Sequence, residues 1–309
     1  MDWSEQTKQA MSCCHCCPRA CGADRLHGET GACGAGMLPA VVRAMPHFYE
    51  EPCISGTQGS GAVFFQGCSL RCVFCQNDSI SRKVDAPALS LDAFCATLEG
   101  LVRRNVHNLN FVTPTHYAYQ IADALRCLQP TIPVIWNTGG YESLETIDML
   151  APLVDVWLPD LKFSDDQTGM RYTAVRDYAT VAFSAVRHMA ELAGAAQYDD
   201  QQMITHGLII RHLCLPGMTT QSKHILQWIR QTLGADAAVS LMRQYFPAGA
   251  AKRDNIRPLN RKLRNDEYER VFDFMMNLGL INGYVQDAEA AEEGYVPDFN
   301  GEGVAEEIQ

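Results

Sequence analysis

The residues best suited to chemistry are Cys68, Cys72 and Cys75, which form a C-x3-C-x2-C array. The array directly follows an apolar run, residues 61–67, that begins and ends in glycine. Three closely spaced thiolates can hold an iron–sulfur cluster, whose irons are usually ligated by four cysteines. Because the loop supplies only three cysteines, one iron would remain open to a ligand that is not protein. The array therefore indicates a cluster that can bind a small molecule.

Two other uses of clustered cysteines compete with this interpretation. Clustered thiols in an intracellular protein can bind zinc, and free cysteine is also common in cores as a small hydrophobe. Zinc sites, however, usually combine paired C-x2-C knuckles or Cys/His sets into four ligands. Three cysteines on one loop fit that pattern poorly, so the spacing favours the iron–sulfur cluster.

The cysteine loop also resembles that of a known superfamily. An aromatic residue, Phe74, precedes the last cysteine, and residues 59–77 read GSGAVFFQGCSLRCVFCQN. This stretch resembles the cluster motif of the radical S-adenosylmethionine (SAM) enzymes. Within them it is similar to the pyruvate formate-lyase activating enzymes and to their uncharacterised relatives with a cysteine-rich N-terminal extension. The resemblance covers nearly the whole chain and is strongest at this loop.

The resemblance implies two cofactors. In that family three cysteines hold a [4Fe–4S] cluster, and SAM chelates the fourth iron through its amino and carboxylate groups. An electron then splits SAM into methionine and a 5′-deoxyadenosyl radical, which abstracts a hydrogen atom. The cofactors carry the difficult chemistry, while the protein positions and shields them. We therefore expect Cys68, Cys72 and Cys75 to be the cluster ligands.

The composition of the chain limits its class and its location. The 309 residues are enough for one large domain or for a main domain with appendages. No apolar stretch approaches the length of a membrane span, and the N-terminus lacks the pattern of a signal peptide. Without export the thiols stay in a reducing compartment, so the 13 cysteines favour metal binding over disulfides. We expect a cytoplasmic protein with no membrane partner.

The negative charge is concentrated near the C-terminus. Residues 285–309 contain eight of the acidic residues and no Lys or Arg, so the rest of the chain carries only about −3 of the net −11. The chain offers no basic stripe to neutralise phosphates, which argues against a nucleic-acid partner. The acidic tail is expected to be a solvated terminus, with docking of a partner as the alternative.

Three segments differ in composition and pattern. Residues 1–45 form a cysteine-rich, metal-binding extension, residues 46–250 the main domain, and residues 251–309 a C-terminal helix with the acidic tail. In the main domain apolar runs of strand length alternate with amphipathic helical stretches. The predicted strands are 61–66, 109–113, 134–137, 154–158, 207–213 and 239–244. The predicted helices are 91–105, 116–128, 143–150, 174–194 and 222–233.

Strands that alternate with helices of this length indicate parallel βαβ units. The six strand-like runs fit an α/β fold, an incomplete (β/α)6 barrel of the TIM-like type. The radical SAM resemblance implies the same fold. In parallel barrels the functional groups lie at the C-terminal ends of the strands. The residues that follow each strand are therefore the candidates for the site.

The second and third predicted strands end in polar residues. The second runs into Thr113-Pro-Thr-His116, where many radical SAM proteins carry Gly-Gly-Glu-Pro for the SAM amino group. His116 is therefore a candidate contact to cofactor or substrate, with the start of a helix as its other explanation. The third ends at Asn137 before two glycines, which allow close backbone approach. The resemblance places Asn137 near SAM.

The next two strands end in charged residues. The fourth runs into Asp160-Leu-Lys162, a sequence that the resemblance places near SAM and the substrate. A structural salt bridge is the alternative. The fifth contains Arg211, which the resemblance places against the SAM carboxylate. A guanidinium matches a carboxylate bidentately, although a paired core arginine is the alternative. Glu50 and Glu51, between the extension and the barrel, either close over the site or cap the barrel.

The extension carries a second set of cysteines. Cys14, Cys17, Cys21 and Cys33 are enough to fill a metal site, and they resemble the extension of the uncharacterised relatives. The pair Cys13 and Cys16 overlaps this pattern, which leaves the ligand assignment open by one residue. A closed zinc site would hold together a short glycine-rich segment that cannot bury a core. An auxiliary iron–sulfur cluster would do the same and could also carry electrons.

Three functions follow in order of preference. The first is a radical SAM enzyme that resembles the activases of glycyl-radical enzymes. The second is radical SAM modification of another protein, peptide or metabolite. The third, from a different class, is an iron–sulfur electron carrier without SAM chemistry, which would be expected to keep four ligands per cluster. An enzyme of the first two kinds needs an electron donor such as a flavodoxin or ferredoxin, and a protein substrate is among its expected partners.

Overall fold

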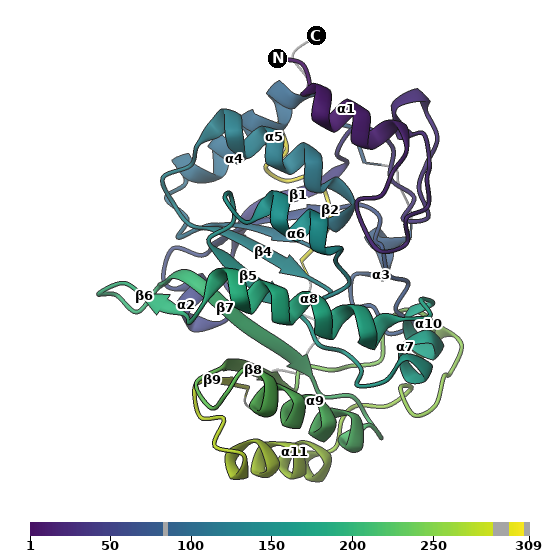
Figure 1. The fold of residues 1–309 in the computed structure, drawn as a ribbon, viewed down its shortest axis with the longest axis vertical. Helices are drawn as coiled ribbons and strands as arrows, with labels where there is room; N and C mark the ends of the chain where they lie inside the picture. The colour runs from purple at the N-terminus through teal and green to yellow at the C-terminus, as the bar shows by residue number, and fades with distance from the viewer. Residues whose placement is uncertain (83–85, 287–296, 306–309) are drawn as a thin grey trace.

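The computed structural model describes residues 1–82, 86–286 and 297–305, and within them one central sheet carries the fold (Figure 1). The strands are β1 (Val41–His47), β2 (Ser60–Phe65), β3 (Leu109–Val112), β4 (Val134–Thr138), β5 (Val156–Pro159), β6 (Gln197–Tyr198), β7 (Ile204–Leu213), β8 (Ala238–Met242) and β9 (Gly283–Val285). Their order in the sheet is β1-β2-β3-β4-β5-β7-β8-β9, with β6 paired to β7. Most of the predicted acidic tail, residues 287–296 and 306–309, lies outside the described residues.

The sheet is an open, incomplete barrel, as predicted. The pairs from β2 to β5, then β5 to β7, β7 to β8 and β8 to β9 are all parallel. β1 adds an antiparallel edge next to β2, and β9 forms the other end. All six predicted strands are present as β2, β3, β4, β5, β7 and β8. The edge strands β1 and β9 include residues outside the 46–250 segment that was predicted to form the barrel.

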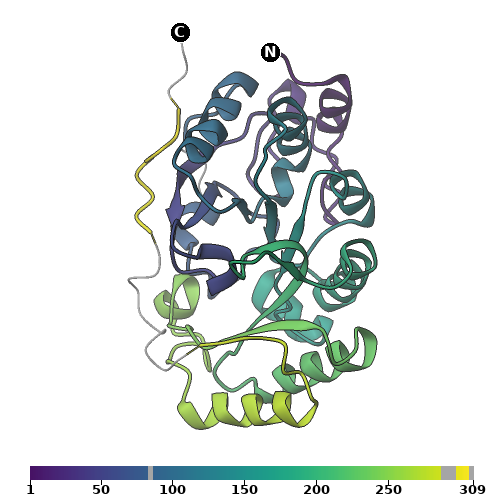
Figure 2. The same cartoon turned by 90° about the vertical axis from the view of Figure 1, so that its left-hand side faces the viewer.

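Helices connect the parallel strands and cover the outside of the sheet. They are α1 (Glu5–Ser12), α2 (Pro52–Ser55), α3 (Asp78–Ser81), α4 (Leu91–Arg103), α5 (Ala118–Leu128), α6 (Leu144–Leu150), α7 (Asp166–Thr173), α8 (Tyr178–Ala193), α9 (Thr219–Thr232), α10 (Gly249–Arg253) and α11 (Asn265–Asn277). Two 3-10 turns, η1 (Arg25–His27) and η2 (Thr115–Tyr117), complete the elements. The helices α5, α6 and α8 stand side by side on one side of the sheet (Figures 1 and 2).

The predicted helices are confirmed with one correction. The stretch predicted as a single helix over residues 174–194 begins only at Tyr178, and α7 precedes it. Ala174 has a positive φ of 59°, so it ends α7 in the left-handed conformation and separates the two helices. Helix α4 illustrates why the others were predictable: Ser90 caps it by accepting the Ala93 amide, and apolar residues recur along its buried face.

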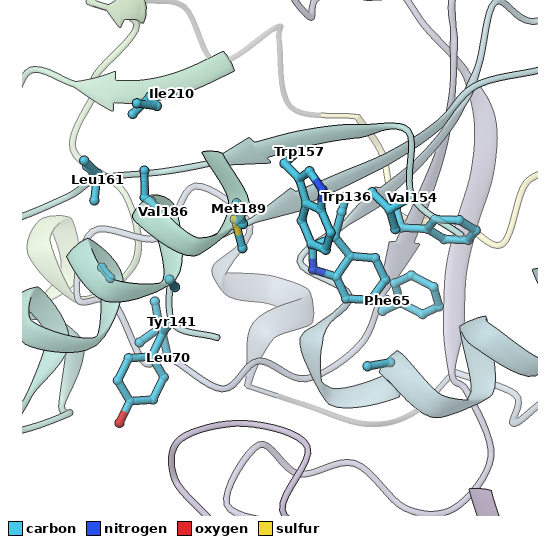
Figure 3. Packing of buried hydrophobic residues seen from close by; sticks show 14 of the residues in the cluster. Phe65, Leu70, Trp136, Tyr141, Val154, Trp157, Leu161, Val186, Met189 and Ile210 are labelled. Atoms are coloured by element: carbon cyan, nitrogen blue, oxygen red, sulfur yellow. The ribbon is translucent and has the colours of Figure 1, made fainter. Parts of the chain in front are cut away.

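The core explains which side chains face the inside of the barrel. Successive residues of a strand point to opposite faces. Trp136 of β4 and Ile210 of β7 pack in the large core between sheet and helices, together with Trp157 (Figure 3). Their neighbours Ile135 and Ile209 pack in a separate cluster inside the barrel. On each strand, the residue that directly follows a residue of the large core therefore points to the inner face of the barrel.

The N-terminal extension packs on the barrel rather than standing apart from it. Helix α1 contacts α5, and the Ser4 hydroxyl donates to Asp123 of α5 at 2.8 Å. The C-terminal segment 297–305 runs along β1 (Figure 2), where the Ala44 amide donates to the Glu302 carbonyl at 2.9 Å. Among the described residues, no helix is long and apolar enough to cross a membrane.

Candidate active site

A cavity of about 230 Å³ opens on the inner face of the barrel. Two of the three loop cysteines and four of the five predicted binding residues line it: Cys72, Cys75, Asn137, Asp160, Lys162 and Arg211. His47, Tyr49, Glu50, Gln244 and Pro297 also belong to its wall. Among the loop cysteines and the predicted binding residues, the structure brings together positions up to 139 residues apart in the chain, from Cys72 to Arg211.

The strand pattern places these residues in the same cavity. Asn137 follows Trp136, and Arg211 follows Ile210, so both point inward where their predecessors point outward. Asp160 comes two residues after Leu158, which lies on the inner face. The backbone of Asp160 forms an isolated parallel β-bridge with that of Arg211 in β7. Parallel strands end at the same edge of a sheet, so the polar residues at their ends meet there.

The cysteine loop lies between β2 and α3, beside the cavity. Burial raises the pKa of Cys72 to about 12, and it also raises the pKa values of Cys68 and Cys75. The charges of Cys72 and Cys75 add to the effect of burial on the pKa of Cys68. Such thiols become ligands when a metal replaces their protons.

The donor set of the loop is three thiols, the ligand type of an iron–sulfur cluster. Within the described part of the chain, no group of three or more His, Cys, Asp or Glu side chains converges as ligands of one metal ion. A [4Fe–4S] cluster distributes its thiolates over several irons, so its ligands need not meet at one point. Three partly buried thiols beside the cavity, with the Lys162 cation near Cys72, therefore fit the cluster that the sequence predicts.

Asp160 and Lys162 form an ion pair beside Cys72. Burial alone would lower the pKa of Lys162, but Asp160 and Cys72 raise it above its usual range. The buried Tyr178 hydroxyl accepts the Lys162 amide at 3.1 Å and lies 3.0 Å from the Asp160 carbonyl oxygen. Gly140, with φ of 81°, packs so close that a Cβ there would lie 2.4 Å from the same oxygen. The turn after β5 is thus rigidly held.

Arg211 is paired with both linker glutamates. Its Nε donates to Glu51 Oε1 at 2.9 Å, and its Nη2 donates to Glu50 and Glu51. Burial alone would raise the pKa of Glu51, but the guanidinium lowers it below its usual range. The glutamates therefore reach into the barrel, where two carboxylates face one guanidinium. The three bonds use Nε and Nη2 of Arg211, which also lines the cavity.

Asn110 belongs to the same network and was not identified from the sequence. Its amide donates to Glu50 Oε1 at 3.1 Å, while Asn137 approaches the same oxygen at 3.4 Å. Asn110 is fully buried, and its Oδ1 has no hydrogen-bond partner. The signal was available, because Asn110 precedes the core residue Phe111 and so lies on the inner face of β3.

His116 lies away from this cavity. It belongs to the turn η2 behind β3, is 1% exposed, and its Nε2 lies 2.9 Å from the Gln66 carbonyl oxygen. Burial lowers its pKa to about 3, which keeps the ring neutral. His116 lines a second, smaller cavity together with five cysteines of the extension: Cys14, Cys16, Cys17, Cys21 and Cys33. The structure therefore groups His116 with the extension and not with Asn137, Asp160, Lys162 and Arg211.

The second cavity contains all four cysteines expected to bind a second metal, and Cys16 in addition. Cys13, the other member of the overlapping pair, is exposed and does not line it. Cys14 Sγ lies 3.6 Å from Cys16 Sγ. A hydrogen bond with the Cys16 thiol is the main cause of the low pKa of Cys14, which is about 5. The positive charge of Arg25 lowers this pKa further.

Glu142 is a second residue that was not singled out from the sequence. It is 2% exposed, and its Oε1 accepts from Thr115 at 2.6 Å and from Trp136 Nε1 at 3.2 Å, as well as from Thr138. Burial raises its pKa to about 7. Its partners come from η2 and β4, so the carboxyl group ties the turn that carries His116 to the sheet.

The extension packs directly on the cysteine loop. The Cys68 amide donates to the Cys33 carbonyl at 3.3 Å, and Arg71 donates to the Ala32 carbonyl at 2.9 Å. Gly67, with φ of 89°, allows this contact, because a Cβ there would lie 2.8 Å from the Cys33 oxygen. The two cysteine sets are therefore neighbours in the fold.

Comparison with known proteins gives one similar sequence and several similar folds. No protein-family model matches the chain. The uncharacterized protein MJ0674 of Methanocaldococcus jannaschii is 29% identical over 288 residues, which cover 90% of this chain and 79% of that protein.

Solved structures of two proteins have a similar fold. SuiB of Streptococcus suis has a TM-score of 0.51 at 13% identity, covering 73% of this chain and 48% of SuiB. A structure of SuiB bound to S-adenosylmethionine has a TM-score of 0.50. A radical SAM methyltransferase from Sphaerobacter thermophilus has a TM-score of 0.51 at 16% identity, covering 73% and 65% of the two chains.

The chain thus spans about half the length of SuiB, and 65% of the length of the methyltransferase. At these identities the likeness concerns the fold. The open, incomplete barrel of β2 to β9, with its helices outside, is therefore a fold that this chain shares with SuiB and with the radical SAM methyltransferase.

Proposed function

We propose that this chain is a radical SAM enzyme that cleaves SAM reductively to start a hydrogen-abstraction reaction. One observation carries the proposal. The loop with the C-x3-C-x2-C spacing lies at the edge of a barrel cavity, and Cys72 and Cys75 share that cavity with Asn137, Asp160 and Arg211. The SAM-bound structure of SuiB, which has a similar fold, supports SAM as the ligand.

Cys68, Cys72 and Cys75 would hold a [4Fe–4S] cluster and leave its fourth iron for SAM. Such a cluster supplies the single electron that splits SAM into methionine and a 5′-deoxyadenosyl radical. The remaining work falls to the chain itself. Lys162 favours the thiolate form of Cys72, and Asp160 holds Lys162 in place. Asn137 and Arg211 would hold SAM, with Arg211 contacting its carboxylate.

The cavity is suited to shield a reactive group. Its wall includes Phe64, Phe74, Leu213 and Phe246 besides the polar residues. A radical near such side chains is kept from water and from unspecific reaction. The reaction requires an external one-electron donor, which we propose to be a flavodoxin or ferredoxin, in the reducing environment of the cytoplasm.

The substrate class is the finer part of the proposal. We infer a protein or peptide substrate, as in the activases of glycyl-radical enzymes that the sequence resembles. A structure of SuiB bound to its precursor peptide, SuiA, supports a polypeptide substrate for a barrel of this kind. Modification of a small metabolite in the same cavity is the alternative within the same chemistry.

We further propose that the cysteines of the extension bind a second metal. Cys14, Cys17, Cys21 and Cys33 line one cavity, which supports this assignment. Zinc and an auxiliary iron–sulfur cluster are both compatible with a thiolate set of this kind.

SAM cleavage is the decisive test. The protein is reconstituted anaerobically with iron and sulfide, reduced with dithionite and incubated with SAM, and 5′-deoxyadenosine is measured by chromatography. We expect release that is abolished in Cys72→Ala and retained in Cys127→Ala, whose thiol is exposed on α5 and outside the cavity. A cluster that dithionite reduces without any SAM turnover would instead favour an electron carrier and overturn the proposal.

A further inference from the structure

Four arginines gather on the outer side of the cysteine loop, residues 68–75, and we call them the arginine face. They are Arg19 of the extension, Arg71 of the loop, Arg171 in the last turn of α7, and Arg176 between α7 and α8. Arg71, Arg171 and Arg176 are exposed, and Arg19 is partly buried. Among the residues that the structure describes, the ion pairs of arginine involve other positions than these four.

Backbone contacts hold the arginine face together. The Arg71 amide donates to the Thr173 carbonyl at 3.1 Å, and the two arginines near the end of α7 lie two and three residues from Thr173. Arg19 Nη2 donates to the Ala174 carbonyl at 3.3 Å. Arg71 in turn reaches the extension, where its Nη2 donates to the Ala32 carbonyl at 2.9 Å. The extension, the cysteine loop and the end of α7 therefore form one surface.

This surface has a charge opposite to that of the chain as a whole. The chain has 36 acidic and 25 basic residues, a net charge of −11. Four arginines, no Lys and no Asp or Glu occur in the segments that meet at the face, which are 13–21, 30–37, 67–77 and 169–176. Like charges that gather without acidic neighbours repel one another. The arginine face is thus a local feature that an acidic partner would stabilise.

The cysteine loop lies between the arginine face and the barrel cavity. Cys72 lines the cavity, whereas its neighbour Arg71 is exposed on the other side of the loop. The Val73 amide donates to the Tyr172 carbonyl at 2.9 Å, which fixes the outer side of the loop against α7. The three thiols of the loop are only partly buried. A protein that binds the arginine face therefore comes close to the loop without entering the cavity.

We propose that the arginine face is the docking surface of the electron donor, an acidic carrier protein that delivers single electrons. The inference rests on the proposed function, because a donor needs a redox-active cluster on the loop. In the step, one electron leaves the reduced carrier and enters the cluster, and no bond is formed or broken. The donor binds outside the loop, so the cavity stays free for SAM and the substrate.

Unpaired surface charge suits such a partner. Complexes of electron-transfer proteins are weak and small, usually below about 1,200 Å² of buried surface, and the carrier leaves after each transfer. Complementary charge acts mainly on the association rate, which it raises about 10–1,000-fold at low ionic strength. An acidic polypeptide substrate could meet the same charges, so the test measures electron delivery with no substrate present.

The test follows reduction of the cluster by a carrier. The full chain is reconstituted anaerobically with iron and sulfide, and the oxidised cluster is mixed with photoreduced flavodoxin in a stopped-flow instrument without SAM. Loss of the visible absorbance gives the second-order rate constant, and electron paramagnetic resonance confirms the reduced cluster. We expect this rate constant to fall about 10-fold or more as the ionic strength rises from ~20 mM to ~0.5 M.

Charge reversal locates the docking surface. Arg171→Glu combined with Arg176→Glu should lower the rate constant about 10–100-fold at low salt and flatten its salt dependence. Neither side chain lines the cavity. Release of 5′-deoxyadenosine with dithionite as the reductant should therefore be unchanged. Lysine at both positions should keep the rate, because the charge persists.

Arg187→Glu combined with Arg230→Glu is the matched control. Both residues are exposed, in the second halves of α8 and α9, and the variant changes the net charge by the same amount. These halves return toward the other end of the parallel strands, away from the cysteine loop. We expect the rate constant of this control to stay within about 2-fold of the wild type, since distant surface charges are screened. Circular dichroism and iron content check every variant.

Three results would overturn the inference. The first is a wild-type rate constant in the charge-reversed face variant, and the second is an equal loss in the α8 and α9 control. The third is a wild-type cluster that dithionite reduces but that neither flavodoxin nor a ferredoxin reduces. Absence of 5′-deoxyadenosine with dithionite would instead reject the proposed function. Because carrier-driven reduction is measured without SAM, the two proposals fail separately.

Discussion

At the scale of single residues, Arg211 balances the buried negative charges inside the barrel. It is 8% exposed and is the cation that faces both Glu50 and Glu51. Removing one partner of a buried ionic group leaves the other charges uncompensated, which costs about 3–5 kcal/mol. We therefore expect Arg211→Met to lower the free energy of unfolding by that amount, measured in urea.

The compensating variant separates charge from packing. If the loss arises from unpaired carboxylates, adding Glu50→Gln and Glu51→Gln to Arg211→Met should recover most of the stability. SAM cleavage should remain impaired in this triple variant, because the guanidinium is still absent. Equal stability of the single and triple variants would show that the carboxylates are not the cause.

His212 predicts a pH dependence of stability. It is fully buried, with Nδ1 2.6 Å from the Leu161 carbonyl oxygen and Nε2 2.8 Å from the Ser222 hydroxyl. Burial lowers its pKa from 6.5 to about 4. Between these values the unfolded chain binds the proton and the folded chain does not, so stability falls as the pH falls. At about 1.4 kcal/mol per pKa unit, the loss amounts to about 3 kcal/mol by pH 4.

The histidine is tested by comparison with His212→Asn. The variant loses packing at every pH but no longer titrates. The difference in unfolding free energy between the two proteins should therefore narrow as the pH is lowered from 7 to 4.5 in urea titrations. Parallel curves would contradict the assignment to His212.

From the sequence alone, the placement of the strand-end residues in one cavity was predictable, and the placement of His116 was not. Asn137, Asp160 and Arg211 follow apolar strands, and a strand end fixes both the edge and the face. His116 also follows a strand, but Thr113 takes a positive φ of 54° and η2 begins at once. That local turn sends the ring behind the sheet. Glu50 could not be assigned either, because its partner Arg211 is 161 residues away.

At the scale of elements, the edge strand β1 is protected by the C-terminal segment 297–305. The Gly301 amide donates to the Val42 carbonyl at 3.0 Å, and the Phe299 ring packs edge-on against Phe64 at 5.4 Å. Arg43 of β1 also pairs with Glu302. An uncovered edge strand presents unpaired amides and carbonyls to other chains. The segment thus closes one end of the open barrel.

A chain that stops at Asp298 should expose this edge. We expect it to associate with increasing concentration, measured by light scattering, and to lose about 1–3 kcal/mol of stability through the two backbone bonds to β1 that it gives up. Glu302→Gln is the control, because it keeps the backbone contacts and removes a half-exposed ion pair worth less than about 1 kcal/mol. A truncated chain that stays monomeric at all concentrations would disprove the protective role.

The elements themselves were predictable where they are long and periodic. The six parallel strands and the five helices between them have apolar patterns that already indicate their type. Their packing in the fold agrees with these patterns. β1 contains Arg43 and Pro46 and pairs on one side with β2, so its sequence does not resemble a buried strand. β9 has three residues and depends on β8 for its existence. Such edge elements are determined by the neighbours on which they pack.

At the scale of the whole molecule, the extension covers the loop that carries the predicted cluster ligands. Arg19 of the extension donates from Nε to the Ser69 carbonyl at 2.5 Å, and the Cys33 carbonyl accepts the Cys68 amide. Iron–sulfur clusters that are accessible to solvent and oxygen are lost more readily than shielded ones, because the surroundings control access to the metal. We therefore predict that the extension shields a cluster bound at the barrel loop.

Gly67→Ala tests this coupling of the two parts. The new Cβ would meet the Cys33 oxygen at 2.8 Å in a residue whose φ is 89°. We expect a loss of about 2 kcal/mol or more. We also expect faster bleaching of the reconstituted cluster in air, followed by its visible absorbance.

Because Gly67 adjoins Cys68, Arg19→Met provides an independent variant, which removes a bond from the extension to the Ser69 carbonyl and changes no residue of the loop. Gly36→Ala is the control, since nothing lies within 4 Å of its added Cβ. If the extension shields the cluster, both interface variants should bleach faster than the wild type and Gly36→Ala should not. An effect in Gly67→Ala that is absent in Arg19→Met would place the cause in the loop itself and reject the protective role.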